Sequence, residues 1–151
     1  MKQSEYLRYD ATALADLIRR GEVTSGEVCE AAVERATRVN GKLNAICYPQ
    51  FSEAPAQPFP EQGVFAGVPL LLKDLAQEQA DHPCTYGSRG MTKNIASRDS
   101  EFVRRARDGG LVFLGRTATP EFGLKAVTES ELWGPTRNPW DTQLTPGGSS
   151  G

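Results

Sequence analysis

The stretch GVPLLLKDL, residues 67–75, contains a continuous apolar run that decides the fold class. Apolar residues without alternation indicate a strand that is covered on both faces, as in a parallel sheet. A second such run, LVFLGRT at residues 111–117, follows EFVRRARDGG at residues 101–110, which has helical periodicity. Strand, helix and strand in this order predict a βαβ unit in an α/β fold. The right-handed crossover puts the loops after both strands on one rim of the sheet, so we expect Lys73 and residues 117–121 to lie there.

Two helices are expected ahead of this unit. The first covers residues 10–21, with Asp10 as its N-cap. The second follows Thr24 and Glu27, which have the spacing of a capping box, and is expected to stop at residues 40–41, an Asn-Gly pair. Both helices are amphipathic, so each has one face to pack against the rest of the chain.

These patterns divide the chain into three segments. Residues 1–50 form a helical opening with a short strand, residues 51–63 form a proline-rich loop, and residues 64–151 begin the α/β core. A length of 151 residues fits one domain or a piece of a larger one.

Composition excludes several classes of function. The chain is 38% hydrophobic and 24% charged, and its net charge of −2 gives no basic excess for nucleic acid. No apolar stretch is long enough to span a membrane, and the start lacks the apolar core of a secretory signal. We therefore expect a cytoplasmic protein that binds neither nucleic acid nor membrane.

The cysteines and the histidine narrow the possible chemistry. Cys29, Cys47 and Cys84 are odd in number and widely spaced, which fits reduced thiols better than disulfides. His82 is the only histidine, and it lies in a polar loop where a surface position is expected. This composition predicts no zinc site of His and Cys, and a Ser-His-Asp triad could draw on His82 alone.

Lys73 is the first candidate for catalysis, because it follows the apolar run at the end of a predicted strand. Partial dehydration disfavours an ammonium, so such a lysine can act as a general base. The alternatives are a salt bridge to Asp74 and a surface lysine whose stem lies along apolar residues.

The closing run, TPGGSSG at residues 145–151, admits three interpretations. It lacks the lysine and spacing of a phosphate-binding loop, and its composition also fits a flexible linker. It can also be a site loop, in which Gly147 and Gly148 permit close approach of the backbone while Ser149 and Ser150 supply hydroxyls that relay protons. Composition alone does not choose among the three.

Four motifs, taken in their order along the chain, carry a resemblance that favours the site loop among these three interpretations. They are FAGVPLLLKDL (65–75), FVRRARDGGLVFLGRTATPEFG (102–123), WGPTRNPWD (133–141) and PGGSSG (146–151). In order and spacing they resemble the N-terminal part of the amidase signature family, and most of all its 6-aminohexanoate cyclic-dimer hydrolase and aryl acylamidase branch. The resemblance implies a mixed, largely parallel sheet covered by helices and preceded by two N-terminal helices.

The resemblance also implies site residues and a reaction. The family hydrolyses amides by acyl transfer through Ser, a second serine that follows a cis peptide bond, and Lys, with no metal or other cofactor. The family's lysine falls on Lys73 and its cis serine on Ser149, while Gly147, Gly148 and Ser150 would support the site loop. The implied substrate is a small linear or cyclic amide, and the full-length protein is a possible homodimer.

One departure limits this interpretation. In the family the nucleophilic serine and the oxyanion hole follow the cis serine in a further glycine-rich motif, and the chain stops at Gly151. We therefore expect a fragment that ends before the nucleophile and hydrolyses nothing by itself. The alternatives are a catalytically inactive binding or assembly module and an amidotransferase A-type subunit.

Aromatic residues near the closing motifs have two possible roles. Trp133, Trp140 and Phe122 either line an acyl pocket or anchor loops to the core. Glu121 is expected to fix a loop rather than to act as an acid.

Overall fold

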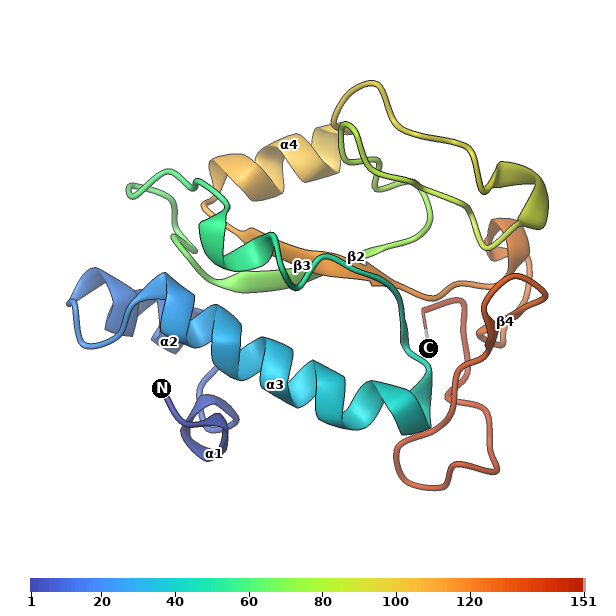
Figure 1. Cartoon of the computed structure of the whole chain (residues 1–151), viewed down its shortest axis with the longest axis horizontal. Coiled ribbons are helices and arrows are strands. Elements are labelled where there is room, and N and C mark those ends of the chain that lie inside the picture. The colour runs from blue at the N-terminus through green and yellow to red at the C-terminus, as the bar shows by residue number, and fades with distance from the viewer. Residues whose placement is uncertain (151) are drawn as a thin grey trace.

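A three-stranded mixed sheet forms the centre of the protein (Figure 1). Strand β2 (Pro69–Lys73) runs parallel to β3 (Val112–Thr117), and β1 (Ile46–Pro49) pairs antiparallel with the other edge of β3. This computed structural model describes residues 1–150. The parallel pair confirms the predicted βαβ unit, whereas no feature of the sequence predicts the antiparallel direction of β1.

Helix α4 (Glu101–Asp108) is the crossover between the parallel strands and covers one face of the sheet. Its residues Val103 and Ala106 pack against Leu72 and Phe113, one from each parallel strand. Three of these four side chains, all but Ala106, are fully buried. Burial of these apolar side chains is the main force that holds the helix on the sheet.

Phe102 on α4 differs from expectation. Helical periodicity predicts that it shares the buried face with Val103 and Ala106, but its side chain is 50% exposed. It is adjacent in sequence to Val103, and neighbouring residues on an α-helix point about 100° apart. Because Val103 is fully buried against the sheet, Phe102 lies at the border of the packed face.

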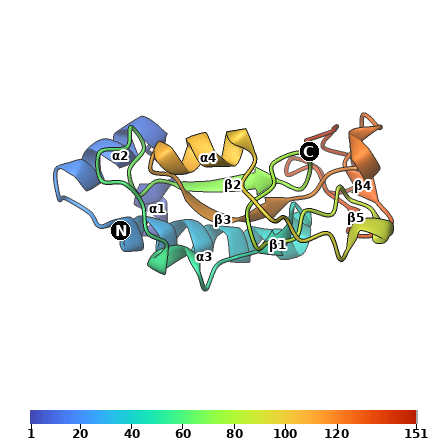
Figure 2. The same ribbon diagram turned by 90° about the horizontal axis from the view of Figure 1, so that it is seen from above.

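Helix α3 (Ser25–Leu43) covers the opposite face of the sheet (Figures 1 and 2). Its residues Cys29 and Ala32 pack against Val112 and Leu114 of β3. The predicted capping box is present, since the side chain of Thr24 accepts from the backbone N–H of Glu27, and Glu27 accepts from that of Thr24. The sheet therefore lies between two helical layers.

The C-terminal end of α3 corrects the prediction that it stops at residues 40–41. The helix continues to Leu43 and ends where Asn44 adopts a left-handed conformation, with φ of 51°. The side chain of Asn40 accepts from the backbone N–H groups of Ala45 and Ile46. Asn40 thus fixes the turn into β1 from inside the helix rather than ending it.

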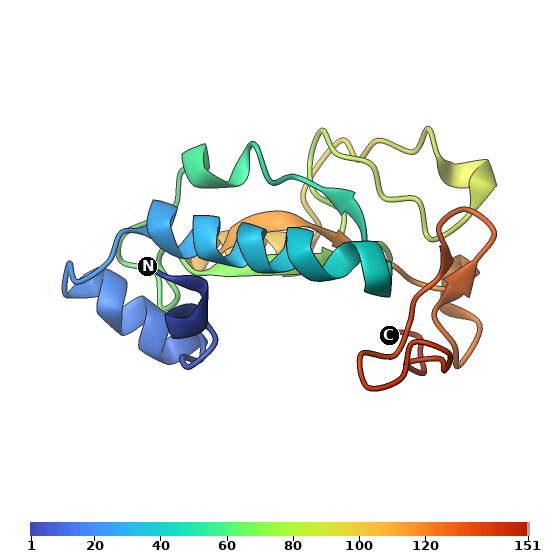
Figure 3. The ribbon, with the colours of Figure 1, turned by 60° about the horizontal axis from the view of Figure 1, so that its bottom comes forward.

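Two short helices open the chain. Helix α2 (Ala11–Arg19) confirms the predicted helix, and the Asp10 side chain accepts from the backbone N–H of Ala13 as an N-cap. Helix α1 (Gln3–Tyr6) is one further turn that the sequence does not predict. Figure 3 shows these helices at one end of the molecule and the C-terminal segment at the other.

The proline-rich loop contains one turn of 3-10 helix, η1 (Ala54–Ala56). Beyond this turn, Gln57 imitates a strand residue beside β3. Its side-chain amide donates to the carbonyl of Phe113 at 2.7 Å and accepts from the N–H of Phe113 at 3.0 Å. The loop therefore covers part of the β3 edge that the short β1 leaves open.

Short elements complete the structure. These are the 3-10 turns η2 (Arg89–Met91) and η3 (Glu121–Gly123), and a hairpin of β4 (Glu129–Ser130) and β5 (Gly134–Pro135). Residues 1–150 include no helix that combines the length and apolar character needed to cross a membrane.

Candidate active site

Lys73 and Ser149 lie together, although 76 positions separate them in the sequence. Lys73 is the last residue of β2, and its Nζ donates a hydrogen bond to Ser149 Oγ at 2.7 Å. Both side chains are half-buried, and the peptide bond between Gly148 and Ser149 is cis. The structure thus brings together the two residues that the resemblance pairs, and their catalytic roles remain predictions.

The backbone of Lys73 is held on both sides by side chains. Its N–H donates to Gln77 Oε1 at 2.6 Å, and its carbonyl accepts from Arg116 Nη1 at 3.2 Å. Arg116 is fully buried on β3 and also donates to the carbonyl of Gln77 at 2.8 Å. The strand end that carries the candidate base is therefore fixed in position.

Asp74 is not the ion partner of Lys73 that one alternative supposes. Its carboxylate is 1% exposed and accepts from the backbone N–H of Thr85 at 2.7 Å, from the Thr85 hydroxyl, and from Trp133 Nε1 at 3.1 Å. The N–H of Gly87 contributes a longer contact at 3.4 Å. These donors compensate for the burial of a carboxylate, which is costly without partners.

The loops after β2 and β3 share one rim, as the βαβ geometry predicts. The backbone N–H of Asp74 donates to the carbonyl of Thr117 at 3.1 Å. Further along both loops, Ser88 Oγ donates to Glu121 Oε1 at 2.6 Å. Glu121 therefore fixes a loop, as expected.

The loop that carries Ser149 is attached to the hairpin region. Thr128 Oγ1 donates to the carbonyl of Gly147 at 2.9 Å. A Cβ on Gly148 would lie 2.7 Å from backbone atoms of Val127, so this contact requires glycine. Ser150 is exposed beside Ser149, and its supporting role stays a prediction. Gly151, the last residue of the closing motif, lies outside the described residues.

The aromatic residues and His82 take different positions. Trp133 is half-buried and bonded to Asp74, so it anchors a loop, whereas Trp140 is 95% exposed and Phe122 is 46% exposed. His82 is half-buried, whereas the sequence predicts a surface position. Its Nδ1 lies 2.7 Å from Nε2 of the buried Gln50. Residues 1–150 contain no group of three or more His, Cys, Asp and Glu side chains suited to a metal ion.

The sequence does not predict three residues that hold the backbone beside Lys73 and Ser149, namely Gln77, Arg116 and Thr128. Arg116 alone leaves a signal, since a charged residue inside an apolar strand requires a buried polar partner. Gln77 and Thr128 lie in segments without periodicity, and their contacts depend on the tertiary fold.

The three cysteines are free thiols. Burial raises the pKa of each, and that of Cys47 rises to about 12. At pH 8, well below that pKa, the Cys47 thiol is protonated, whereas the thiolate is the reactive form. We expect iodoacetamide at pH 8 to label the folded chain very slowly and the urea-unfolded chain at all three thiols. Fast labelling of any thiol in the folded chain contradicts this expectation.

Comparison with known proteins identifies the family. The family described as amidase matches residues 27–151. The chain belongs to the amidase family. It is 44% identical over 144 residues to the 6-aminohexanoate-cyclic-dimer hydrolase of Paenarthrobacter ureafaciens, an alignment that covers 94% of this chain and 29% of that protein.

Other amidases give the same result. A solved structure of 6-aminohexanoate cyclic dimer hydrolase complexed with substrate superposes with a TM-score of 0.85 at 42% identity, over 94% of this chain and 30% of that one. A bacterial aryl acylamidase of the amidase signature family superposes with a TM-score of 0.84 at 27% identity, over 94% and 31%. The A-type subunit of the glutamyl-tRNA(Gln) amidotransferase of Mycolicibacterium gilvum is 35% identical over 162 residues, covering 98% and 32%.

These comparisons confirm the family resemblance and the fold class that the motifs predict. They also show that the chain spans less than a third of the length of these relatives.

Proposed function

We propose that this chain supplies Lys73 and Ser149 to the active site of an enzyme that hydrolyses linear or cyclic amides. One observation carries the proposal, namely the 2.7 Å contact between Lys73 Nζ and Ser149 Oγ. Membership of the amidase family and 44% identity to a cyclic-amide hydrolase support it. A small amide as substrate, a cytoplasmic location and a homodimer remain predictions.

The proposed reaction is acyl transfer with a proton relay. Neutral Lys73 takes the proton of the Ser149 hydroxyl, and Ser149 takes a proton from a nucleophilic serine as that oxygen attacks the amide carbonyl carbon. The C–N bond then breaks, and the relayed proton goes to the departing amine. Water cleaves the acyl-serine ester through the same relay, which releases the carboxylic acid and restores the serine.

The nucleophile and the oxyanion hole belong to a longer polypeptide in this proposal. Family resemblance puts both after residue 151, and the chain spans 29% of the hydrolase from Paenarthrobacter. Residues 1–151 are then the first portion of one amidase domain, in which residues 1–50, 51–63 and 64–151 form the helical opening, the loop and the start of the core. By itself the chain is expected to hydrolyse nothing.

An amidotransferase A-type subunit is the second candidate, and 35% identity to one such protein favours keeping it. The same relay would serve both, since each begins with cleavage of an amide. They differ in the fate of the nitrogen: a free-standing hydrolase releases the amine to water, whereas an amidotransferase passes ammonia to an acceptor.

A chimera tests the proposal. In this amidase chimera, residues 1–151 replace the aligned part of the 6-aminohexanoate-cyclic-dimer hydrolase of Paenarthrobacter ureafaciens. We expect the purified 151-residue chain to show no hydrolysis of the cyclic dimer, and the chimera to hydrolyse it above the uncatalysed rate. Formation of the linear dimer of 6-aminohexanoate from the cyclic dimer is measured by chromatography.

Two outcomes contradict the proposal. Hydrolysis by the 151-residue chain alone would show that no downstream nucleophile is needed. A chimera that folds, as judged by circular dichroism and a cooperative thermal transition, and that still hydrolyses nothing would show that this chain does not supply the missing half of the site. The unmodified hydrolase is the positive control.

A further inference from the structure

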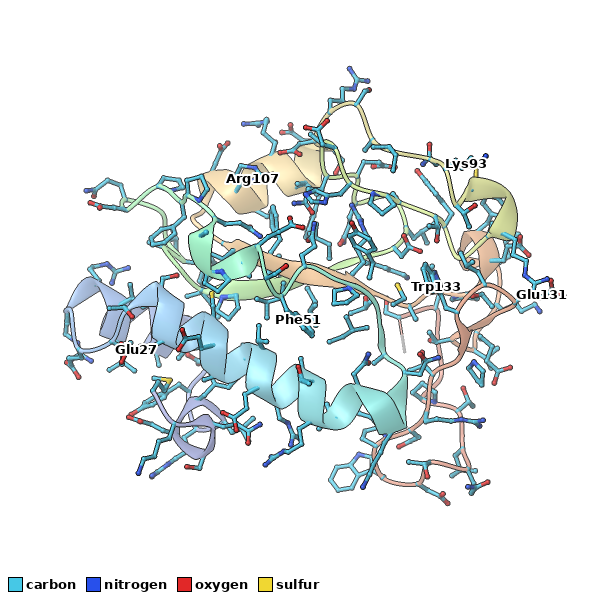
Figure 4. The ribbon with its side chains drawn as sticks, viewed as in Figure 1. Glu27, Phe51, Lys93, Arg107, Glu131 and Trp133 are labelled. Atoms are coloured by element: carbon cyan, nitrogen blue, oxygen red, sulfur yellow. The ribbon has the colours of Figure 1, made fainter. Side chains whose placement is uncertain are left out.

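Trp133 joins two parts of the candidate site that are far apart in sequence. It lies in the turn between β4 and β5, and Figure 4 shows it between the end of the sheet and the hairpin. Its indole Nε1–H donates to Asp74 Oδ2 at 3.1 Å and to Thr85 Oγ1 at 3.2 Å. The indole is thus attached directly to the residue that follows Lys73.

The Asp74 end of this connection is buried and held by several hydrogen bonds. The carboxylate is almost completely buried, and two donors of Thr85 hold it in addition to the indole. The backbone N–H of Asp74 continues the pairing of β2 with β3 by donating to the carbonyl of Thr117. Since Asp74 cannot move without breaking the sheet end, Lys73 and the acceptor of the indole form one unit.

The other end of the connection reaches the Ser149 loop through the hairpin. Thr128, which precedes β4, is fully buried, and it accepts from the N–H of Thr136 through its carbonyl at 2.9 Å. Its hydroxyl donates to the carbonyl of Gly147, also at 2.9 Å. A shift of the hairpin would therefore carry Gly147 and Ser149 with it.

The contacts close a ring that runs from Lys73 through Asp74, Trp133, the hairpin, Thr128 and the loop to Ser149, and back to Lys73. We propose that Trp133 is a positioning residue that sets the spacing between Lys73 and Ser149 through its bond to Asp74. This role rests on the proposed function, since the spacing matters only if the two residues relay a proton. A displacement of about 1 Å can lower the rate of a reaction about 10²-fold.

Lysine labelling in the 151-residue chain tests the spacing without any enzyme activity. Lys73 is half-buried and bonded to Ser149, whereas Lys93 is exposed and serves as an internal reference. Each chain is treated with a small amount of acetylating reagent at pH 8, and the rates at both lysines are read by mass spectrometry. Trp133→Phe keeps an aromatic ring but removes the N–H, and Trp140→Phe is the matched control at an exposed tryptophan.

We expect Trp133→Phe to raise the labelling of Lys73 relative to Lys93 at least about tenfold, the size expected for loss of one hydrogen bond to a charged group. Trp140→Phe leaves the ratio unchanged. If the ratio is also unchanged in Trp133→Phe, even with a lowered thermal midpoint, then Trp133 is merely structural and the proposal is wrong. If Trp133→Phe does not fold, the same labelling experiment is carried out on Thr128→Val, which removes the hydrogen bond from Thr128 to the carbonyl of Gly147. An unchanged ratio of Lys73 to Lys93 labelling in that variant overturns the proposal.

Kinetics in the amidase chimera separate this inference from the proposed function. We expect Trp133→Phe to lower kcat about 10-fold to 10²-fold and to leave KM within about twofold, because misplacement affects the relay and not the binding of the amide. A rise in KM with unchanged kcat contradicts a positioning role. An inactive parent chimera counts against the proposed function alone, and the labelling ratio then decides the role of Trp133.

Discussion

Replacement of Lys73 by alanine in the amidase chimera is expected to lower kcat/KM for amide hydrolysis about 10³-fold. Lys73 Nζ is the group bonded to Ser149 Oγ, and general acid–base groups contribute about 10²-fold to 10⁴-fold to catalysis. Without the amine, the proton of the attacking serine has no base to receive it. Initial rates of cyclic-dimer hydrolysis, measured over a range of substrate concentrations, give the effect.

Lys93→Ala is the matched control for this prediction, because it removes an exposed lysine elsewhere on the surface. Its kcat/KM should stay within about twofold of the parent, as expected for a surface substitution. A Lys73→Ala chimera that keeps more than a tenth of the parent activity would show that another group is the base.

Phe113→Ala in the 151-residue chain is expected to lower the free energy of unfolding by about 3–5 kcal/mol. Phe113 is fully buried on the central strand, and it packs against Leu72, Val103 and Ala106. Truncation removes apolar contacts on the α4 side of the sheet and leaves a cavity where the crossover helix docks. Urea titration followed by circular dichroism measures the loss.

Phe102→Ala is the matched control for Phe113→Ala. Phe102 is a phenylalanine of α4, the helix that covers this face of the sheet, but its side chain is 50% exposed. We expect its cost to be below about 1 kcal/mol. Equal losses for the two substitutions would mean that the core does not lie between α4 and the parallel strands.

The sequence predicts the central unit well because its signals are local. The apolar runs of β2 and β3, the caps at Asp10 and Thr24, and the periodicity of α4 each depend on residues close together in the chain. The rim shared by Lys73 and Glu121 follows from the handedness of the crossover, which is a general property of such units.

The rest of the site depends on contacts between distant segments. Strands β4 and β5 have two residues each, too few to show alternation, so the hairpin that holds Trp133 leaves no pattern. The pairing of Lys73 with Ser149 comes from motif resemblance, because no propensity relates positions 76 apart. The four partners of the Asp74 carboxylate are equally beyond local patterns.

A double-substitution cycle on Lys73 and Ser149 tests most directly whether the two residues act as one proton relay. Three variants of the amidase chimera are compared with the parent: Lys73→Ala, Ser149→Ala and the double substitution. Groups that act as a unit give strongly non-additive losses of activity. We therefore predict that kcat/KM of the double variant is within about threefold of kcat/KM of the less active single variant. If instead the two losses in kcat/KM multiply, Lys73 and Ser149 act independently, and the relay that their 2.7 Å contact suggests does not exist.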